Sequence, residues 1–395
     1  MLLIAAPGQG AQSPGFLSAW LELPGFADRL AAWSELAGCD LIRCGSTASA
    51  QEITDTAVAQ PLLVAAAVAA AQELLGGLGQ ASRLAGAAAG HSVGELAAGA
   101  VAGVIGPQDA LRLAGVRGQA MARAAAAEPT GMTAVLGGDE AAVLDAIDRH
   151  GLTAANVNGP GQIVAAGTAG QLAAFAADPP AGARLRPLPV AGAFHTRHMA
   201  PATGALRAAA SSVTVSDPQL ALLSDADGSV VRTGADWMER IVSQVSAPVR
   251  WDLCMKSMTG LGVSALIELP PAGTLTGLAR RALPGVQLAA LKTPDDLQAA
   301  RGLIGEHHQA DDDSHAPDWR LLVAPLAGTF RASCSGGGPG VAVGTGAELG
   351  HVEIRGGSHL VAPAFPATII EWLVEDGDPV SVGQPLVRLQ PDGSE

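Results

Sequence analysis

Cysteine is scarce in this chain of 395 residues. Its four cysteines, Cys39, Cys44, Cys254 and Cys334, are scattered, with no C-x-x-C pair and no histidine at ligand spacing. This pattern argues against a metal site and predicts buried thiols.

Long apolar runs are also missing. No run reaches about 18 residues without a glycine, a proline or a charge, and the first residues lack the basic start of a signal peptide. We therefore expect a soluble cytoplasmic protein with no membrane segment. The formal net charge of −14 argues against general nucleic-acid binding, although a local basic patch remains compatible with it.

The chain is long enough for two or three domains. Up to about residue 304, short apolar runs alternate with alanine-rich helical periods, which predicts an α/β domain. Residues 124–190 follow a β-α-β-β-α-β order and are expected to form an inserted ferredoxin-like subdomain. The expected strands are 132–137, 152–157, 162–167 and 183–190, and the expected helices are 139–150 and 169–177.

The last part of the chain has a different pattern. Residues 305–318 carry five acids, no lysine or arginine and no apolar period, which predicts an acidic linker. Beyond it, Val323-Ala-Pro recurs as Val361-Ala-Pro. Two similar β-rich halves, each too small to bury its own apolar face, are expected to pair into one small barrel.

The most informative motif is Gly90-His91-Ser92-Val93-Gly94. It follows an apolar run and precedes a helix-forming stretch, which is the strand-turn-helix setting of a nucleophile elbow. The flanking glycines relieve the strained turn, and the helix N-terminus behind it stabilises negative charge. With 50 glycines in the chain, the motif could arise by chance, so its context decides.

Two further residues are candidates for the same chemistry. Arg117 lies in an Ala/Leu-rich helical segment, where a buried guanidinium would select substrates with a free carboxylate; the alternative is a surface arginine. His195 follows a strand-like run and could act as a general base toward Ser92; the alternative is a structural histidine. The Pro7–Gln12 loop, taken alone, is a generic glycine loop.

Together these residues resemble the malonyl-CoA:acyl carrier protein transacylases. Seven separated motifs match in order and approximate spacing over residues 1–304, and this makes the resemblance specific. They are Pro7-Gly-Gln9-Gly-Ala-Gln12, Gln60-Pro61, Gly90-His91-Ser92-Val93-Gly94-Glu95, Arg117-Gly118, Asn156-Val-Asn158, Gly192-Ala-Phe194-His195 and Pro248-Val-Arg-Trp251. The resemblance implies an α/β-hydrolase-like large subdomain around the inserted one.

The resemblance also implies a two-step transfer through a malonyl-serine. Ser92 would give its proton to His195 and attack the malonyl thioester, and the phosphopantetheine thiol of the carrier would then take the malonyl group. The oxyanion would be held by the backbone N–H groups of Gln9 and Val93. No acid is apparent to orient the histidine; the family uses main-chain oxygens and a glutamine, for which Gln244 is the match.

Substrate and carrier contacts follow from the same resemblance. Arg117 would bind the malonyl carboxylate, and Phe194 would crowd a 2-methyl branch, so that methylmalonyl groups should react slowly. Gln60 and Asn156 are further candidates for substrate binding. Carrier proteins are acidic, so a basic patch is expected beside the pocket. The candidates for that patch are Arg280, Arg281 and Arg197.

Residues 319–391 resemble the biotinyl/lipoyl carrier domain, a small all-β hammerhead. Such domains attach their cofactor to a lysine on the hairpin between the halves, where this chain has Arg355 or Gly356. The chain has only two lysines, Lys256 and Lys292, and both precede this region. We therefore expect neither biotin nor lipoate, no other cofactor and no metal, and the region is expected to be a docking or oligomerisation module or an inert relic.

The expected activity is malonyl transfer in fatty-acid synthesis. The same transfer could instead serve a polyketide synthase or a malonate decarboxylase. A serine hydrolase shares the elbow but needs water access and an ordered acid. A non-catalytic interaction protein is suggested only by the C-terminal region.

Overall fold

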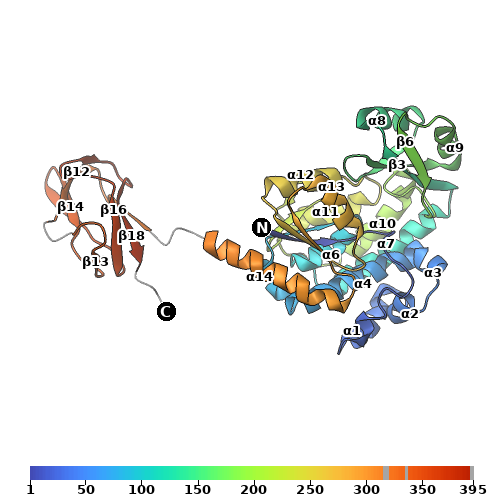
Figure 1. Ribbon diagram of the computed structural model, residues 1–395, viewed down its shortest axis with the longest axis horizontal. Helices are drawn as coiled ribbons and strands as arrows, with labels where there is room; N and C mark the ends of the chain where they lie inside the picture. The colour runs from blue at the N-terminus through green and yellow to red at the C-terminus, as the bar shows by residue number, and fades with distance from the viewer. Residues whose placement is uncertain (315–319, 334–336, 392–395) are drawn as a thin grey trace. The chain divides into compact units, whose positions relative to one another are not determined.

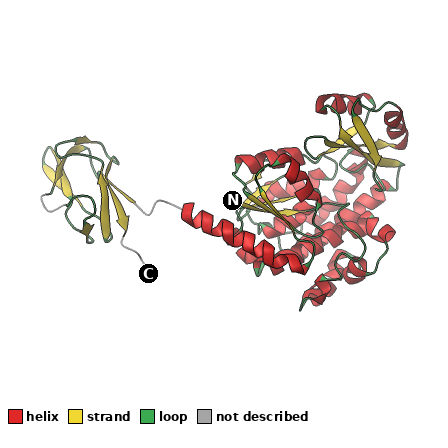
Figure 2. Cartoon of the chain, viewed as in Figure 1, coloured by secondary structure: helices red, strands yellow, loops and turns green. Residues whose placement is uncertain are grey.

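The computed structural model describes residues 1–314, 320–333 and 337–391. The chain divides into two compact units, Met1–Asp311 and Asp312–Glu395 (Figures 1 and 2). Cys44 and Cys254 are buried free thiols, as predicted, whereas Cys39 is half-buried and Cys334 lies outside the described residues.

The first unit is built on a six-stranded sheet in the order β10-β9-β1-β2-β7-β8. The five strands from β10 to β7 are parallel, and β8 pairs antiparallel to β7. The C-terminal ends of the parallel strands therefore open at one edge, where sites in such sheets form. The strands are β1 (Leu2–Ala6), β2 (Ala87–Gly90), β7 (Ala221–Leu223), β8 (Val230–Val231), β9 (Ala265–Glu268) and β10 (Gln287–Ala290).

Helices cover both faces of this sheet, which is why β1 is apolar at every position. Leu2 and Ile4 contribute to one apolar core, and Leu3 and Ala5 to the other, because successive side chains of a strand point to opposite faces. The helices are α1 (Phe26–Ala37), α2 (Leu41–Ser46), α3 (Ala50–Thr54), α4 (Thr56–Leu75), α5 (Ala81–Leu84), α6 (Gly94–Val101), α7 (Pro107–Ala125), α10 (Ala200–Ala210), α11 (Gly234–Gln244), α12 (Trp251–Gly260), α13 (Thr274–Ala282) and α14 (Leu297–Ser314). Short 3-10 turns are η1 (Trp20–Glu22), η2 (Leu78–Gln80), η3 (Arg197–Met199) and η4 (Pro294–Asp296).

Helix α4 is long and apolar enough to cross a membrane by length and composition. It packs against α6 and α7 instead, and 83% of its most apolar window is buried in the fold. A buried core helix can have the same length and apolar composition as a membrane-spanning helix. Helix α4 therefore does not contradict the prediction of a chain without membrane segments.

A second, smaller layer is inserted between α7 and η3. Its elements are β3 (Thr130–Gly137), α8 (Glu140–Arg149), β4 (Thr153–Val157), β5 (Gln162–Thr168), α9 (Ala169–Ala177) and β6 (Ala183–Pro187). The sheet order is β4-β5-β3-β6 with every neighbouring pair antiparallel. An isolated bridge between Asn156 and Val249 ties the end of β4 to the larger layer, so this insertion reaches the edge where the parallel strands end.

The prediction of a linker beginning at residue 305 was wrong for residues 305–314, because α14 continues to Ser314. Its first turns are anchored by the buried Leu297, Ala300 and Ile304. A helix that is nucleated by packing extends through good helix formers such as Glu306 without an apolar period of its own. Residues 315–319 lie outside the described part of the chain.

The described residues of the second unit form two four-stranded sheets, ordered β11-β18-β16-β13 and β15-β14-β12-β17. Each sheet takes two strands from each half of the sequence repeat. The strands are β11 (Arg320–Val323), β12 (Gly328–Ala332), β13 (Ala342–Val343), β14 (Gly350–Ile354), β15 (Gly357–Val361), β16 (Ala367–Trp372), β17 (Pro379–Val380) and β18 (Pro385–Pro391). In the β14-β15 hairpin Ile354 pairs with Gly357, which places Arg355 and Gly356 at the tip.

Candidate active site

The candidate nucleophile lies on a strained turn between β2 and α6. Ser92 has a φ of 55°, in the left-handed region that side chains rarely adopt. A Cβ on Gly90 would lie 2.1 Å from the backbone of Gly94, and a Cβ on Gly94 would lie 2.3 Å from the carbonyl oxygen of Ala6. Both flanking positions therefore require glycine, and the turn presents Ser92 at the N-terminus of α6.

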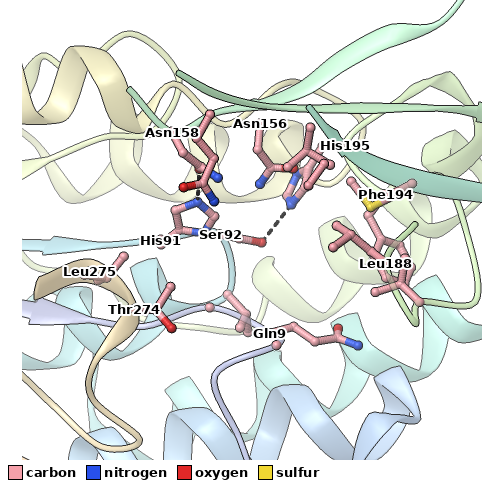
Figure 3. A pocket seen from close by; sticks show the side chains of 18 of the residues that line it. Gln9, His91, Ser92, Asn156, Asn158, Leu188, Phe194, His195, Thr274 and Leu275 are labelled. Carbon is pink, nitrogen blue, oxygen red and sulfur yellow. Dashed lines mark hydrogen bonds between the residues drawn. The ribbon is translucent and has the colours of Figure 1, made fainter. Parts of the chain in front are cut away.

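His195 meets Ser92 from the loop that follows the inserted layer. The Ser92 Oγ lies 2.8 Å from His195 Nε2 (Figure 3). The other ring nitrogen, Nδ1, lies 2.9 Å from the carbonyl oxygen of Gln244, which only accepts, so Nδ1 carries the proton and Nε2 accepts from the serine. Burial, reinforced by the charge of Arg117, lowers the pKa of His195 to about 3, so the imidazole is neutral.

Arg117 is fully enclosed, with 1% of its surface exposed. From α7 its Nη1 donates to Gln60 Oε1 at 2.7 Å, and its Nη2 donates to Gln244 Oε1 at 2.7 Å. The same Nη2 lies 3.3 Å from Ser92 Oγ. Burial lowers the pKa of Arg117 to about 10, which leaves the guanidinium charged at neutral pH. The arginine is therefore a buried cation beside the serine, and the surface alternative is excluded.

A cavity of about 270 Å³ opens in front of the serine. Predicted site residues on its wall, besides Ser92 and His195, are Gln9, Gln60, Val93, Asn156 and Phe194. Gln9 lies across the cavity from Asn156 and Asn158 (Figure 3). Within the described residues, no acceptor is hydrogen-bonded to the backbone N–H of Gln9 or of Val93. Met121, Met132, Leu188 and Val190 complete an apolar wall.

A family model described as an acyl transferase domain matches residues 6–308. A relative from Mycobacterium tuberculosis, named malonyl CoA-acyl carrier protein transacylase, is 54% identical over 306 residues, which is 77% of this chain and 100% of the relative. The chain belongs to the malonyl CoA-acyl carrier protein transacylase family. The crystal structure of MCAT from Mycobacterium tuberculosis superposes with a TM-score of 0.73 at 53% identity, covering 76% of this chain and 99% of that one.

A further transacylase structure contains a carrier. It is described as a type II PKS acyl-carrier protein in complex with its malonyl-transacylase, with a TM-score of 0.68 and 28% identity over 76% of this chain and 99% of that one. These matches confirm the α/β fold and the transacylase family. The match to the family model ends at residue 308, so the second unit of this transacylase lies outside the matched region.

The structure places two carboxylates, to which the sequence analysis assigned no role, behind the serine of the transacylase. Asp225 Oδ2 accepts the backbone N–H of Ser92 at 2.6 Å, and Glu95 Oε1 accepts the N–H of Asp225 at 2.9 Å. Neither contacts His195 Nδ1, so the arrangement is not a Ser-His-Asp triad. Burial raises the pKa of Glu95 to about 7 and raises that of Asp225 well above its ordinary value. The available signal was Glu95 itself, a charged residue at the start of an apolar helix.

His91 and Asn158 also escaped notice as individual residues, although both lie within matched motifs. His91 Nε2 lies 2.9 Å from Asn158 Oδ1, and both side chains line the cavity (Figure 3). Burial lowers the pKa of His91. Their position beside Ser92 adds a polar wall opposite Gln9.

The three arginines expected to contact a carrier are exposed and lie outside the cavity. Arg280 and Arg281 are on α13, whose Leu275 and Leu278 line the cavity. Arg281 Nη2 donates to Gln162 Oε1 at 3.0 Å, and Gln162 is also part of the lining. Arg197 begins η3, two residues after His195. No group of three His, Cys, Asp or Glu residues suited to a metal occurs in the described part of the chain.

Proposed function

The chain is an acyltransferase, and we propose that it moves a malonyl group from malonyl-CoA to the phosphopantetheine thiol of an acyl carrier protein. The observation that carries this proposal is the convergence on Ser92 Oγ of a neutral histidine at 2.8 Å and a buried guanidinium at 3.3 Å. The histidine activates the hydroxyl, and the guanidinium selects an acyl group that ends in a carboxylate.

The reaction proceeds in two balanced halves. Ser92 Oγ attacks the thioester carbonyl as its proton passes to His195 Nε2, and the oxyanion is held by the N–H groups of Gln9 and Val93. The C–S bond breaks, CoA leaves with the proton from His195, and malonyl-Ser92 remains. The carrier thiol then gives its proton to His195 and attacks the ester. The bond between the acyl carbon and Ser92 Oγ breaks, Ser92 Oγ takes the proton back from His195, and the malonyl group leaves as a thioester of the carrier. The carbonyl oxygen of Gln244 keeps His195 oriented throughout.

Side chains around the cavity sort the acyl groups. Arg117 pairs with the malonyl carboxylate while Gln60 fixes the guanidinium, whereas an acetyl group has no carboxylate to form this ion pair. Phe194, with 6% of its surface exposed, closes the space where a 2-methyl branch would lie. Asn156, which lines the cavity, contributes to substrate binding.

The carrier docks beside α13. Arg280, Arg281 and Arg197 lie on elements that reach the cavity, and their charge complements an acidic partner despite the negative net charge of the chain. We assign the transfer to fatty-acid biosynthesis in the cytoplasm, with polyketide synthesis or malonate decarboxylation as the alternative destinations of the same malonyl group.

The domain assignment is also a proposal. It comprises an α/β-hydrolase-like large subdomain, a ferredoxin-like insertion over residues 124–190 and a biotinyl/lipoyl-like domain over residues 319–391. The β4-β5-β3-β6 order supports the second, and the paired halves of the second unit support the third. Because Arg355 and Gly356 occupy the hairpin tip, this domain carries no cofactor and serves as a docking or oligomerisation module or as a relic. A streptavidin-reactive band or a lipoyl mass shift would contradict this assignment.

The proposed activity is tested by intact mass after brief incubation with malonyl-CoA. The wild-type chain should gain one malonyl group, Ser92→Ala should gain none, and Ser211→Ala, which changes an exposed serine of no proposed role, should behave as wild type. Added carrier protein should discharge the adduct. Absence of an adduct together with hydrolysis of simple esters would instead identify a serine hydrolase.

A further inference from the structure

Two buried carboxylates, Glu95 and Asp225, take no part in the steps above, yet they contact the catalytic turn directly. Glu95 is 1% exposed and Asp225 is 0% exposed. Asp225 follows β7 and binds the backbone N–H of Ser92, while Glu95, in the first turn of α6, binds the N–H of Asp225. The left-handed turn at Ser92 therefore depends on the carboxylate of Asp225, which lies 133 residues later in the sequence.

A single amide connects these carboxylates to the guanidinium. Gln244 Nε2 donates to Glu95 Oε2, and it lies 3.2 Å from the carbonyl oxygen of Ser92 and 3.4 Å from Asp225 Oδ2. Its Oε1 accepts from Arg117, which fixes the orientation of the amide. The acid pair, the nucleophile and Arg117 thus form one buried network.

The charges of this network nearly cancel. Of the described groups around the pair, Arg117 on α7 is the cation, whereas His195 and His91 are kept neutral by burial. Cys254 on α12 faces Asp225 as a thiol, since burial raises its pKa well above the ordinary value. Two carboxylates this close in a low-dielectric interior cannot both ionise readily, so one proton stays on the pair. One negative charge then balances Arg117.

We propose that Glu95 and Asp225 are positioning residues that hold Ser92 and balance Arg117, and that the pair takes up one proton from solvent when the malonyl carboxylate reaches Arg117. This inference rests on the proposed function. The incoming carboxylate neutralises the guanidinium, and the remaining anion of the pair then lies unpaired in the interior. Protonation of that carboxylate removes the excess charge, and no other bond changes.

The pH range follows from the pKa of about 7 for Glu95. Above pH 7 the free pair carries one negative charge, so malonyl-CoA binding consumes a proton and the affinity falls by up to about tenfold per pH unit. Near pH 6 Glu95 is already largely protonated in the free chain, so binding needs little or no proton. The dependence is therefore confined to the alkaline side.

The test is calorimetric titration of malonyl-CoA into the Ser92→Ala chain, in two buffers of different ionisation enthalpy, at pH 8 and pH 6. We expect uptake of about 0.5–1 proton per malonyl-CoA at pH 8 and close to zero at pH 6. Binding without buffer dependence at pH 8 overturns the inference and leaves the proposed function intact. Absence of binding overturns the proposed function itself.

Two variants in the same background identify the acceptor. The double variant Glu95→Gln/Asp225→Asn, which removes both ionisable groups at nearly constant shape, should abolish the uptake, and His195→Asn should retain it. Uptake that disappears with His195→Asn and survives the double variant assigns the proton to the histidine and refutes the proposal.

The positioning role has a separate readout in the chain with Ser92 intact. Asp225→Asn retains an oxygen that can accept the Ser92 N–H and should keep the rate of malonyl-enzyme formation within a few-fold of wild type. Asp225→Ala should lose at least tenfold while its thermal transition remains cooperative. Equal losses in the two variants would contradict positioning through this hydrogen bond.

Discussion

Replacement of Arg117 by alanine should change the acyl selectivity of the enzyme more than its general activity. The guanidinium is 1% exposed and lies 3.3 Å from Ser92 Oγ, so the malonyl carboxylate that we propose it binds would be buried with it. Removing one partner of a buried ion pair costs about 3–5 kcal/mol. At 1.36 kcal/mol per factor of ten, kcat/KM for malonyl-CoA should fall by roughly 150- to 5,000-fold.

Acetyl-CoA carries no carboxylate, so its kcat/KM should change by less than about tenfold. Arg117→Lys keeps the charge but has a single nitrogen, whereas Arg117 reaches both Gln60 and Gln244. Its kcat/KM for malonyl-CoA should therefore lie between those of wild type and Arg117→Ala.

The assay compares the transfer of malonyl and acetyl groups from CoA to a carrier protein, with thermal melting to confirm the fold. Arg112→Ala is the matched control, since Arg112 lies on the same helix, is exposed and pairs only with Asp109 among the described residues. Its selectivity should equal that of wild type. A parallel loss of malonyl and acetyl transfer in Arg117→Ala would show that Arg117 only supports the fold.

Three other outcomes are expected. Gly94→Ala should lower the free energy of unfolding by about 1–3 kcal/mol in urea titrations, because its Cβ would lie 2.3 Å from the Ala6 oxygen. Gly204→Ala has open space around its Cβ and should raise the free energy of unfolding by about 0.5–1 kcal/mol. Because the pKa of His195 is about 3, kcat/KM for malonyl-enzyme formation should stay level from pH 7 to pH 5, whereas a histidine of ordinary pKa would lower it by roughly 25-fold over this range. A chain ending at Ser314 should form the malonyl-enzyme at the wild-type rate, since every site residue lies in the first unit; a slower rate would assign the second unit a part in the reaction.

The catalytic turn could be predicted from sequence because its requirements are local. A strained turn needs small neighbours, and the clearances at Gly90 and Gly94 show how little space there is. Arg117 and His195 were different, since local pattern left a surface arginine and a structural histidine as alternatives. Only the resemblance to the transacylases favoured the buried arrangement that the structure contains.

The acid pair could not be found in this way, because it depends on which strands are neighbours. Asp225 meets Ser92 because β7 pairs with β2, and nothing in the residues near Asp225 distinguishes it from an ordinary turn aspartate. The resemblance did identify Gln244 as a partner of the histidine, but only the structure shows that its carbonyl oxygen orients the ring while its side chain binds Arg117. Sequence can propose a residue, but not which of its atoms acts.

Backbone strain and chemistry coincide in this fold. Among the described residues, the non-glycine positions with positive φ are Ser92 at 55° and His195 at 61°. Such conformations cost about 1–3 kcal/mol each and persist only where the surroundings impose them. Ser92 is held by Asp225 and by the Gln244 amide, and His195 by the Gln244 carbonyl oxygen. A buried hydrogen bond between neutral groups contributes about 0.5–1.5 kcal/mol, so these bonds together offset much of this strain. The buried network therefore does more than balance charge, because it keeps the nucleophile and the base in conformations that neither residue would adopt alone.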